Sequence, residues 1–134
     1  MQDRPDAREL LEAVRAFLEE QVVPALEGTP QFHARVAANV LAIIGRELVL
    51  GEDALRAEWH RLARVLRTPG TNPPDGGAAL AAAVRELNTR LAEAIRAGDA
   101  DEGARRAEVL AHLRATSAER LAIANPKYAA PRER

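Results

Sequence analysis

Cysteine is absent from this sequence of 134 residues, only four residues are aromatic, and the formal net charge is −1. The absence of cysteine excludes disulfides, thiolate metal sites and a cysteine nucleophile. A net charge this close to zero argues against a surface for nucleic acid or for an anionic membrane. No apolar run approaches the roughly 20 residues that a membrane-spanning helix needs. The amino terminus lacks the basic and apolar regions of a signal peptide, so we expect a cytoplasmic protein.

Alanine and leucine dominate what is present, with 29 and 16 residues, or about a third of the chain. Alanine is the strongest helix former, and the β-branched residues that favour strands are few. The composition therefore predicts an all-α fold. The chain has 18 arginines but a single lysine, which is typical of a GC-rich bacterial genome. Its length fits a single domain that covers residues 1–134.

Apolar residues recur at helical spacing in five segments. The first begins with Asp6 and Glu9, which are spaced as in a capping box, and contains Pro24, where we expect a kink. The second begins at Pro30, with Thr29 as its N-cap, and we expect Gly51 to end it. The five predicted helices cover residues 6–27, 30–50, 53–67, 78–97 and 101–125.

Two segments lack this spacing. Residues 68–77 contain three prolines and three glycines, so the sequence predicts a loop between the third and fourth helices. Pro126 ends the fifth helix, and we expect a frayed tail over residues 126–134. Helices joined by short connections favour a compact antiparallel bundle of about five helices. The run VAANVLAII (residues 36–44) is apolar on most sides, which predicts that the second helix is central and buried.

The fifth predicted helix contains a histidine that we weighed as a metal ligand. The inner stripe of this predicted helix, which we expect to face the core, consists of Ala107, Leu110, Leu113, Ser117 and Leu121. His112 aligns with Arg105, Glu108 and Glu119 on the opposite side, which we expect to face solvent. A di-metal bundle needs Glu-x-x-His on two helices, and this motif does not occur. The sequence also lacks phosphate-loop, dinucleotide-binding and nucleophile-elbow motifs, so it predicts no metal, no cofactor and no catalytic residue.

Four polar residues are the candidate ligand-binding residues: His33, Arg35, Asn39 and Asn88. His33 lies in the first turn of the second helix and can act as an acid or a base. Arg35 and Asn39 form a narrow polar stripe, which either faces water or lines a seam inside the bundle. In a seam, Arg35 can bind a carboxylate or phosphate with two hydrogen bonds. A buried Asn39 needs a polar partner, and we expect Asn88 to be that partner, in a structural network or in a ligand cleft.

Three stretches resemble a known bacterial family: RPDARELLEAVRAFLEE, FHARVAANVLAIIGREL and LRATSAERLAIANPKY. The family, which contains short helical proteins, is domain-of-unknown-function family 6285. The resemblance implies a stand-alone helical protein with no known catalytic residues. It further implies that the protein accompanies phosphotransferase-like and acyl-CoA dehydrogenase-like enzymes. This would give it an accessory role in acyl-CoA metabolism.

These observations leave two hypotheses. The first is a non-catalytic accessory protein that presents a helix face to a partner enzyme or to a second copy, as a twofold homodimer. The second is a small ligand-binding protein or enzyme whose cleft lies between the second and fourth helices and is formed by the four polar candidates.

Overall fold

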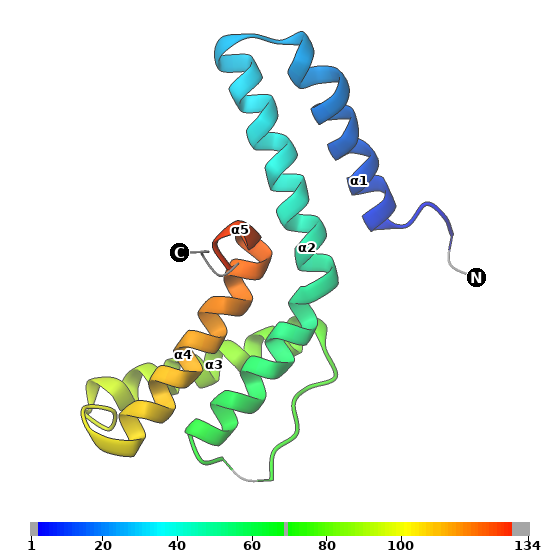
Figure 1. Cartoon of the computed structure of the whole chain (residues 1–134). Coiled ribbons are helices and arrows are strands. Elements are labelled where there is room, and N and C mark those ends of the chain that lie inside the picture. The colour runs from blue at the N-terminus through cyan, green and yellow to red at the C-terminus, as the bar shows by residue number, and fades with distance from the viewer. Residues whose placement is uncertain (1–2, 69, 130–134) are drawn as a thin grey trace. The chain divides into compact units, whose positions relative to one another are not determined.

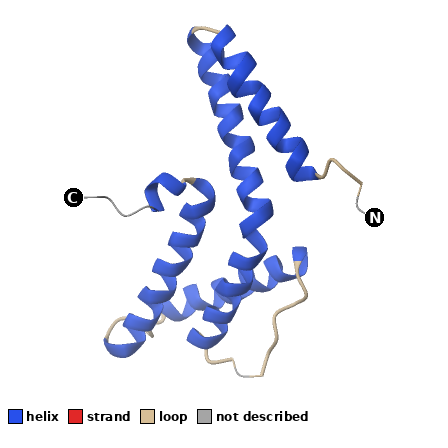
Figure 2. Ribbon diagram, turned by 45° about the vertical axis from the view of Figure 1, so that its right-hand side comes forward, coloured by secondary structure: helices blue, strands red, loops and turns tan. Residues whose placement is uncertain are grey.

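The computed structural model describes residues 3–68 and 70–129, and these residues form helices and loops without any strand (Figures 1 and 2). The all-α prediction is therefore confirmed. The longer helices are α1 (Ala7–Phe17), α2 (Gly28–Val65), α3 (Gly77–Arg96) and α4 (Gly103–Ala124), and a short helix α5 covers Pro126–Ala129. None of the described helices has the length and apolar content to cross a membrane.

The chain divides into two compact units, Met1–Leu50 and Gly51–Arg134, which we call the amino-terminal and carboxy-terminal units. The boundary lies inside α2 rather than in a linker, so this one helix contributes to both units. The predicted frayed tail begins instead with α5, and its residues 130–134 lie outside the described part of the chain.

The first helix begins as predicted but ends earlier. The carboxylate of Asp6 accepts a hydrogen bond from the backbone N–H of Glu9 at 2.8 Å. The carboxylate of Glu9 accepts one from the backbone N–H of Asp6, also at 2.8 Å. The predicted kink at Pro24 is wrong, because the helix passes through a π turn (Leu18–Val22) and a 3₁₀ turn (Val23–Ala25) and then stops. Proline lacks the N–H that a continuing helix needs. The side-chain amide of Gln31 donates to the carbonyl oxygen of Val23 at 3.0 Å, which satisfies a group at this helix end.

The second and third predicted helices form one helix of 38 residues, so the predicted end at Gly51 is wrong. A glycine inside a helix costs about 1 kcal/mol relative to alanine, but strong helix formers flank it. Gly51 is buried, and the turns that follow it pack in the core of the carboxy-terminal unit. Tertiary packing therefore outweighs the local preference.

The core of the carboxy-terminal unit lies between the last turns of α2, the inner face of α3 and the first half of α4. Leu62 of α2 and Leu80 of α3 are its most completely buried side chains. The spacing of the fourth segment predicts an inner stripe of Leu80, Val84, Leu87, Leu91 and Ile95, and its first four members are buried on α3. The cluster consists of Trp59, Leu62, Val65, Leu80, Val84, Leu87, Leu91 and Val109.

The loop between α2 and α3 is confirmed, and its end is attached to α2. The guanidinium of Arg56 donates to the carbonyl oxygen of Asp75 at 2.9 Å and also pairs with Glu52 at 3.1 Å. These bonds hold the last residues of the loop beside α2, immediately before α3 begins.

In the amino-terminal unit, α1 lies alongside the first half of α2 as a helical hairpin (Figure 1). The expected burial of the segment 30–50 is not found. Only Ala34 and Ala38 of this segment are buried, whereas Val36, Val40 and Ile44 are 41–45% exposed. The single short helix α1 covers the alanine side of α2 and leaves its β-branched side open.

The predicted inner face of α4 is also wrong. Leu110, Leu113 and Leu121 are exposed. The buried face instead consists of Val109, His112, Thr116 and Ile123. The helix therefore turns an apolar stripe toward solvent and places a histidine against α2.

The core predicts a contrast between two leucines. Leu80→Ala should lower the free energy of unfolding by about 2–5 kcal/mol, because it leaves a cavity in a fully buried site. Leu110→Ala, the matched control on the exposed side of α4, should change it by about 1 kcal/mol or less. Urea unfolding followed by the fluorescence of Trp59, the only tryptophan, measures both. Equal losses in the two variants would contradict the described orientation of α4.

Candidate functional site

A layer of polar side chains joins α2 to α4 beside the apolar core of the carboxy-terminal unit. Arg61 of α2 donates from both terminal nitrogens to the carboxylate of Glu119 on α4, at 2.8 Å and 2.5 Å. It also donates to the hydroxyl of Thr116 at 3.3 Å. Both members of the ion pair are mostly shielded from solvent. A two-point contact of this kind holds the guanidinium in one orientation.

A second carboxylate in this layer is bound by two other helices. Glu58 of α2 is 5% exposed. The amide of Asn88 on α3 donates to its Oε1 atom at 2.8 Å, and Arg120 of α4 lies 3.7 Å from the same oxygen. The polar partner of Asn88 is therefore Glu58, not Asn39 as we expected.

His112 lies inside this layer, only 3% exposed, and among the described residues neither of its ring nitrogens has a hydrogen-bond partner. Burial lowers the pKa of His112 below its usual value, and the charge of Arg61 lowers it further. Glu58 and Glu119 act on this pKa in the opposite direction. The lowered pKa favours the neutral imidazole, whose one donor and one acceptor have no partner among the described residues. Burying such groups without partners costs free energy.

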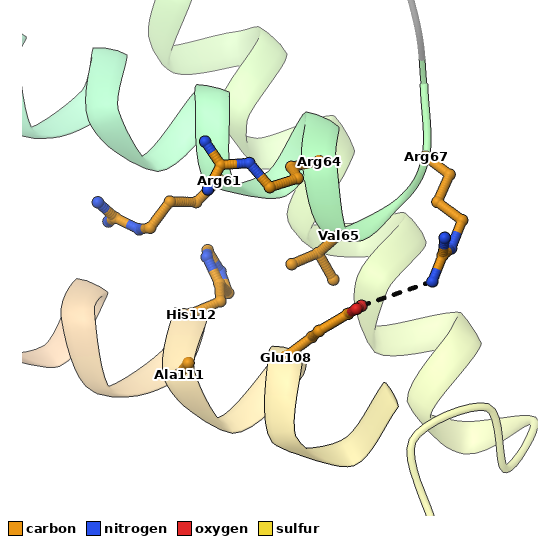
Figure 3. A pocket seen from close by; sticks show the side chains of 7 residues that line it. All are labelled: Arg61, Arg64, Val65, Arg67, Glu108, Ala111 and His112. Carbon is orange, nitrogen blue, oxygen red and sulfur yellow. Dashed lines mark ion pairs between the residues drawn. The ribbon is translucent and has the colours of Figure 1, made fainter. Parts of the chain in front are cut away.

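A pocket of about 330 Å³ opens between α2 and α4 at His112. In Figure 3, His112 points from α4 toward α2, and Arg67 turns toward Glu108, whose carboxylate lies 3.7 Å from it. The wall combines three guanidinium groups and one carboxylate with apolar surface, and it contains no serine, threonine or cysteine. It can therefore bind a charged group but offers no side-chain hydroxyl or thiol nucleophile. Its residues are Arg61, Arg64, Val65, Arg67, Glu108, Ala111 and His112.

The last turn of α2 places Arg67 at this pocket in an unusual backbone conformation. The N–H of Arg67 donates to the carbonyl of Arg64 at 3.1 Å, and that of Thr68 donates to the carbonyl of Ala63 at 3.0 Å. These two bonds form a Schellman motif, whose left-handed position is usually glycine. Arg67 occupies that position with φ = 53°, which costs a residue with a side chain about 1–2 kcal/mol.

The four sequence-predicted site residues are divided between the two units. His33, Arg35 and Asn39 are exposed on the first half of α2, in the amino-terminal unit. Asn88 is half-buried on α3, in the carboxy-terminal unit. The structure therefore brings them together in neither unit, and ligand binding by these residues stays a prediction.

Comparison with known proteins identifies the family. The family described as "Domain of unknown function (DUF6285)" matches residues 24–128. The chain belongs to this family. The DUF6285 match contains α2, α3, α4 and all seven pocket residues, whereas α1 precedes it. No curated protein and no solved structure matches the chain.

Sequence reasoning missed the polar layer of this DUF6285 protein because it chose the wrong face of α4. The leucines of α4 form the bulkier stripe, and we expected that stripe to be buried. A competing signal was present, since Val109, Thr116 and Ile123 recur every seven residues and are β-branched. The stripe that they mark is the buried one, and His112 lies on it.

The lowered pKa of His112 predicts a pH-dependent stability. The unfolded state binds a proton more readily than the folded state, so the free energy of unfolding should fall as the pH falls below the ordinary histidine pKa of 6.5. Urea unfolding between neutral and mildly acidic pH measures this slope. His112→Gln should flatten it, and His60→Gln, at an exposed position, should keep it. An unchanged slope in His112→Gln would show that another group titrates.

Proposed function

We propose that this protein is a non-catalytic accessory protein that acts through helix association, and that its amino-terminal hairpin pairs with the hairpin of a second copy. The observation that carries this proposal is an open apolar row on α2. Its members are spaced four residues apart, which places neighbours on one side of a helix. All five are between 41% and 62% exposed: Phe32, Val36, Val40, Ile44 and Leu48.

The hairpin has two chemically different sides. A charged groove runs along one side, where Arg8, Glu12 and Arg15 of α1 lie near Arg46 of α2. Successive residues of a helix are rotated by about 100°, and the two helices are antiparallel (Figure 1). The rotation therefore places the exposed apolar residues of both helices on the side opposite the groove. These residues are Leu10, Val14 and Phe17 of α1 and Val40, Ile44 and Leu48 of α2.

Two helices cannot enclose a core on their own, and a four-helix bundle made from two hairpins is the simplest arrangement that covers such a face. Single exposed apolar residues are ordinary on a protein surface, but a contiguous row marks an interaction surface.

The spacing of the row favours a second copy as its occupant. The row is symmetric about Val40, so an antiparallel twofold pair centred on this residue places Val36 beside Ile44 of the second copy. The polar residues of the same face, His33 and Glu47, are also seven residues on either side of Val40. Antiparallel pairing thus places each His33 beside Glu47 of the second copy. Parallel pairing would instead place His33 beside His33 and Glu47 beside Glu47.

Sedimentation equilibrium tests the pairing. The wild-type protein should have twice the 14.5 kDa mass of one chain. Val40→Glu should yield a monomer that keeps its helical circular dichroism, because it buries two unpaired charges at the centre of the interface. Leu113→Glu, at a similarly exposed site on α4, should remain dimeric. A monomeric wild-type protein would overturn the proposal, as would dissociation by Leu113→Glu alone.

A charge exchange tests the orientation. His33→Glu should weaken the dimer, because it sets two carboxylates side by side. Adding Glu47→Lys should restore it, since each introduced glutamate would then face an introduced lysine of the second copy. In a parallel pair the double variant would still oppose like charges, so failure of the rescue would contradict antiparallel pairing.

An accessory protein acts on a partner enzyme, which we call its client. We propose that the client is one of the acyl-CoA-metabolising or phosphotransferase-like enzymes that the family resemblance implies. Co-purification of the tagged wild-type protein from its host tests this part. Recovery of such an enzyme supports it. Recovery of copies of this chain alone would overturn the client while leaving the pairing in place.

A further inference from the structure

We propose that the pocket between α2 and α4 binds the oxyanion group of a small molecule, a carboxylate or a phosphate carried by a short apolar group. This site lies within the carboxy-terminal unit and does not depend on the pairing of hairpins. It also uses none of the four residues that the sequence suggested.

The charge of the wall is the first argument. The side chains that line it carry three positive charges and one negative charge. Arg61 is already bound by Glu119 and acts as a fixed positive wall. Arg67 is opposed only by Glu108 in a long, exposed ion pair, which holds it weakly. Arg64 is exposed, and its guanidinium has no hydrogen bond or ion pair among the described residues. Arg64 and Arg67 are therefore free to turn toward an anion.

The second argument is the imidazole of His112. It lines the pocket, it is almost wholly buried, and both of its nitrogens are without a partner in the described part of the chain. Glu58 shows that the same layer does provide partners for a buried polar group. A ligand oxygen would accept a hydrogen bond from the ring N–H and so satisfy a donor that has no partner among the described residues.

The size and the walls of the pocket restrict the ligand. A volume of about 330 Å³ is at the lower end of the range for small-molecule sites. Val65 and Ala111 form the apolar part of the wall, beside the guanidinium groups. This combination suits a short organic acid or a small phosphate ester, because guanidinium groups bind either oxyanion with two parallel hydrogen bonds.

The third argument is the residue at the end of α2. Glycine would relieve the left-handed backbone at position 67, yet the chain places there an arginine whose side chain lines the pocket. Strained positions of this kind concentrate at binding sites, where the side chain serves a purpose other than stability.

Isothermal titration calorimetry with inorganic phosphate and with butyrate tests the proposal and separates the two oxyanions. We expect saturable binding of at least one of them at a single site. Arg64→Ala should weaken it about tenfold or more, because a hydrogen bond to a charged group is lost. Arg90→Ala removes the same charge from an exposed position on α3 and should bind as the wild type does. Absence of saturable binding for both probes would overturn the proposal, as would an equal loss in Arg90→Ala.

A second variant separates binding from stability. Arg67→Gly should raise the urea midpoint of unfolding, because it relieves the backbone, and at the same time weaken binding several-fold. A purely structural role for Arg67 would change the midpoint alone. Wild-type affinity in both Arg67→Gly and Arg64→Ala would therefore remove the arginines from the site and overturn the proposal.

Discussion

The carboxy-terminal unit depends on one apolar layer, in which Leu62 of α2 and Leu80 of α3 are completely removed from water. Burial of a leucine contributes about 1.5–3 kcal/mol, and this layer determines how the last turns of α2 meet their neighbours. The polar side chains of α2 and α4 then face each other at its edge. The pairing of Arg61 with Glu119 is a consequence of that alignment, because the same two residues on free helices would be hydrated and would gain little from contact.

The members of the polar layer differ in how many hydrogen-bond and ion-pair partners they have. The carboxylate of Glu58 is reached from α3 and α4, and the guanidinium of Arg61 is engaged on two sides. His112 receives nothing comparable, although it is buried as deeply as Glu58. A layer that only stabilised the fold would satisfy all of its members, since one unsatisfied member removes much of the benefit of the rest. Among the described residues, the two ring nitrogens of His112 and the Nε atom of Arg61 are buried without a partner, which agrees with the ligand site that we propose.

Local chemistry was readable from the sequence, and tertiary choices were not. The capping box of Asp6 and Glu9 was predicted correctly, because it involves residues three apart and nothing else. The inner stripe of α3 was also correct, because that helix has only one apolar side. At Gly51 the local signal favoured a helix end, but packing of the following turns decided otherwise. Two stripes of α4 could have been buried, the leucine stripe or the β-branched stripe. Which of them packs against α2 depends on the surface of α2, and the sequence of α4 alone does not contain that information.

The surroundings of the candidate residues depend on tertiary packing in the same way. The polar stripe of Arg35 and Asn39 was identified correctly as a stripe, but whether it is enclosed depends on how many helices surround that part of α2. Only α1 does so within the amino-terminal unit. The enclosed polar residues occur farther along the same helix, at Glu58 and Arg61, where two further helices pack.

The left-handed arginine at the end of α2 has an evolutionary consequence. A lineage selected for thermodynamic robustness alone would drift toward glycine at position 67, since a single codon change relieves the backbone. A lineage that uses the neighbouring imidazole would resist that drift. Within the family, residues 67 and 112 should therefore change together. Branches that have lost both the arginine and the histidine would be those in which the pocket no longer binds the proposed ligand.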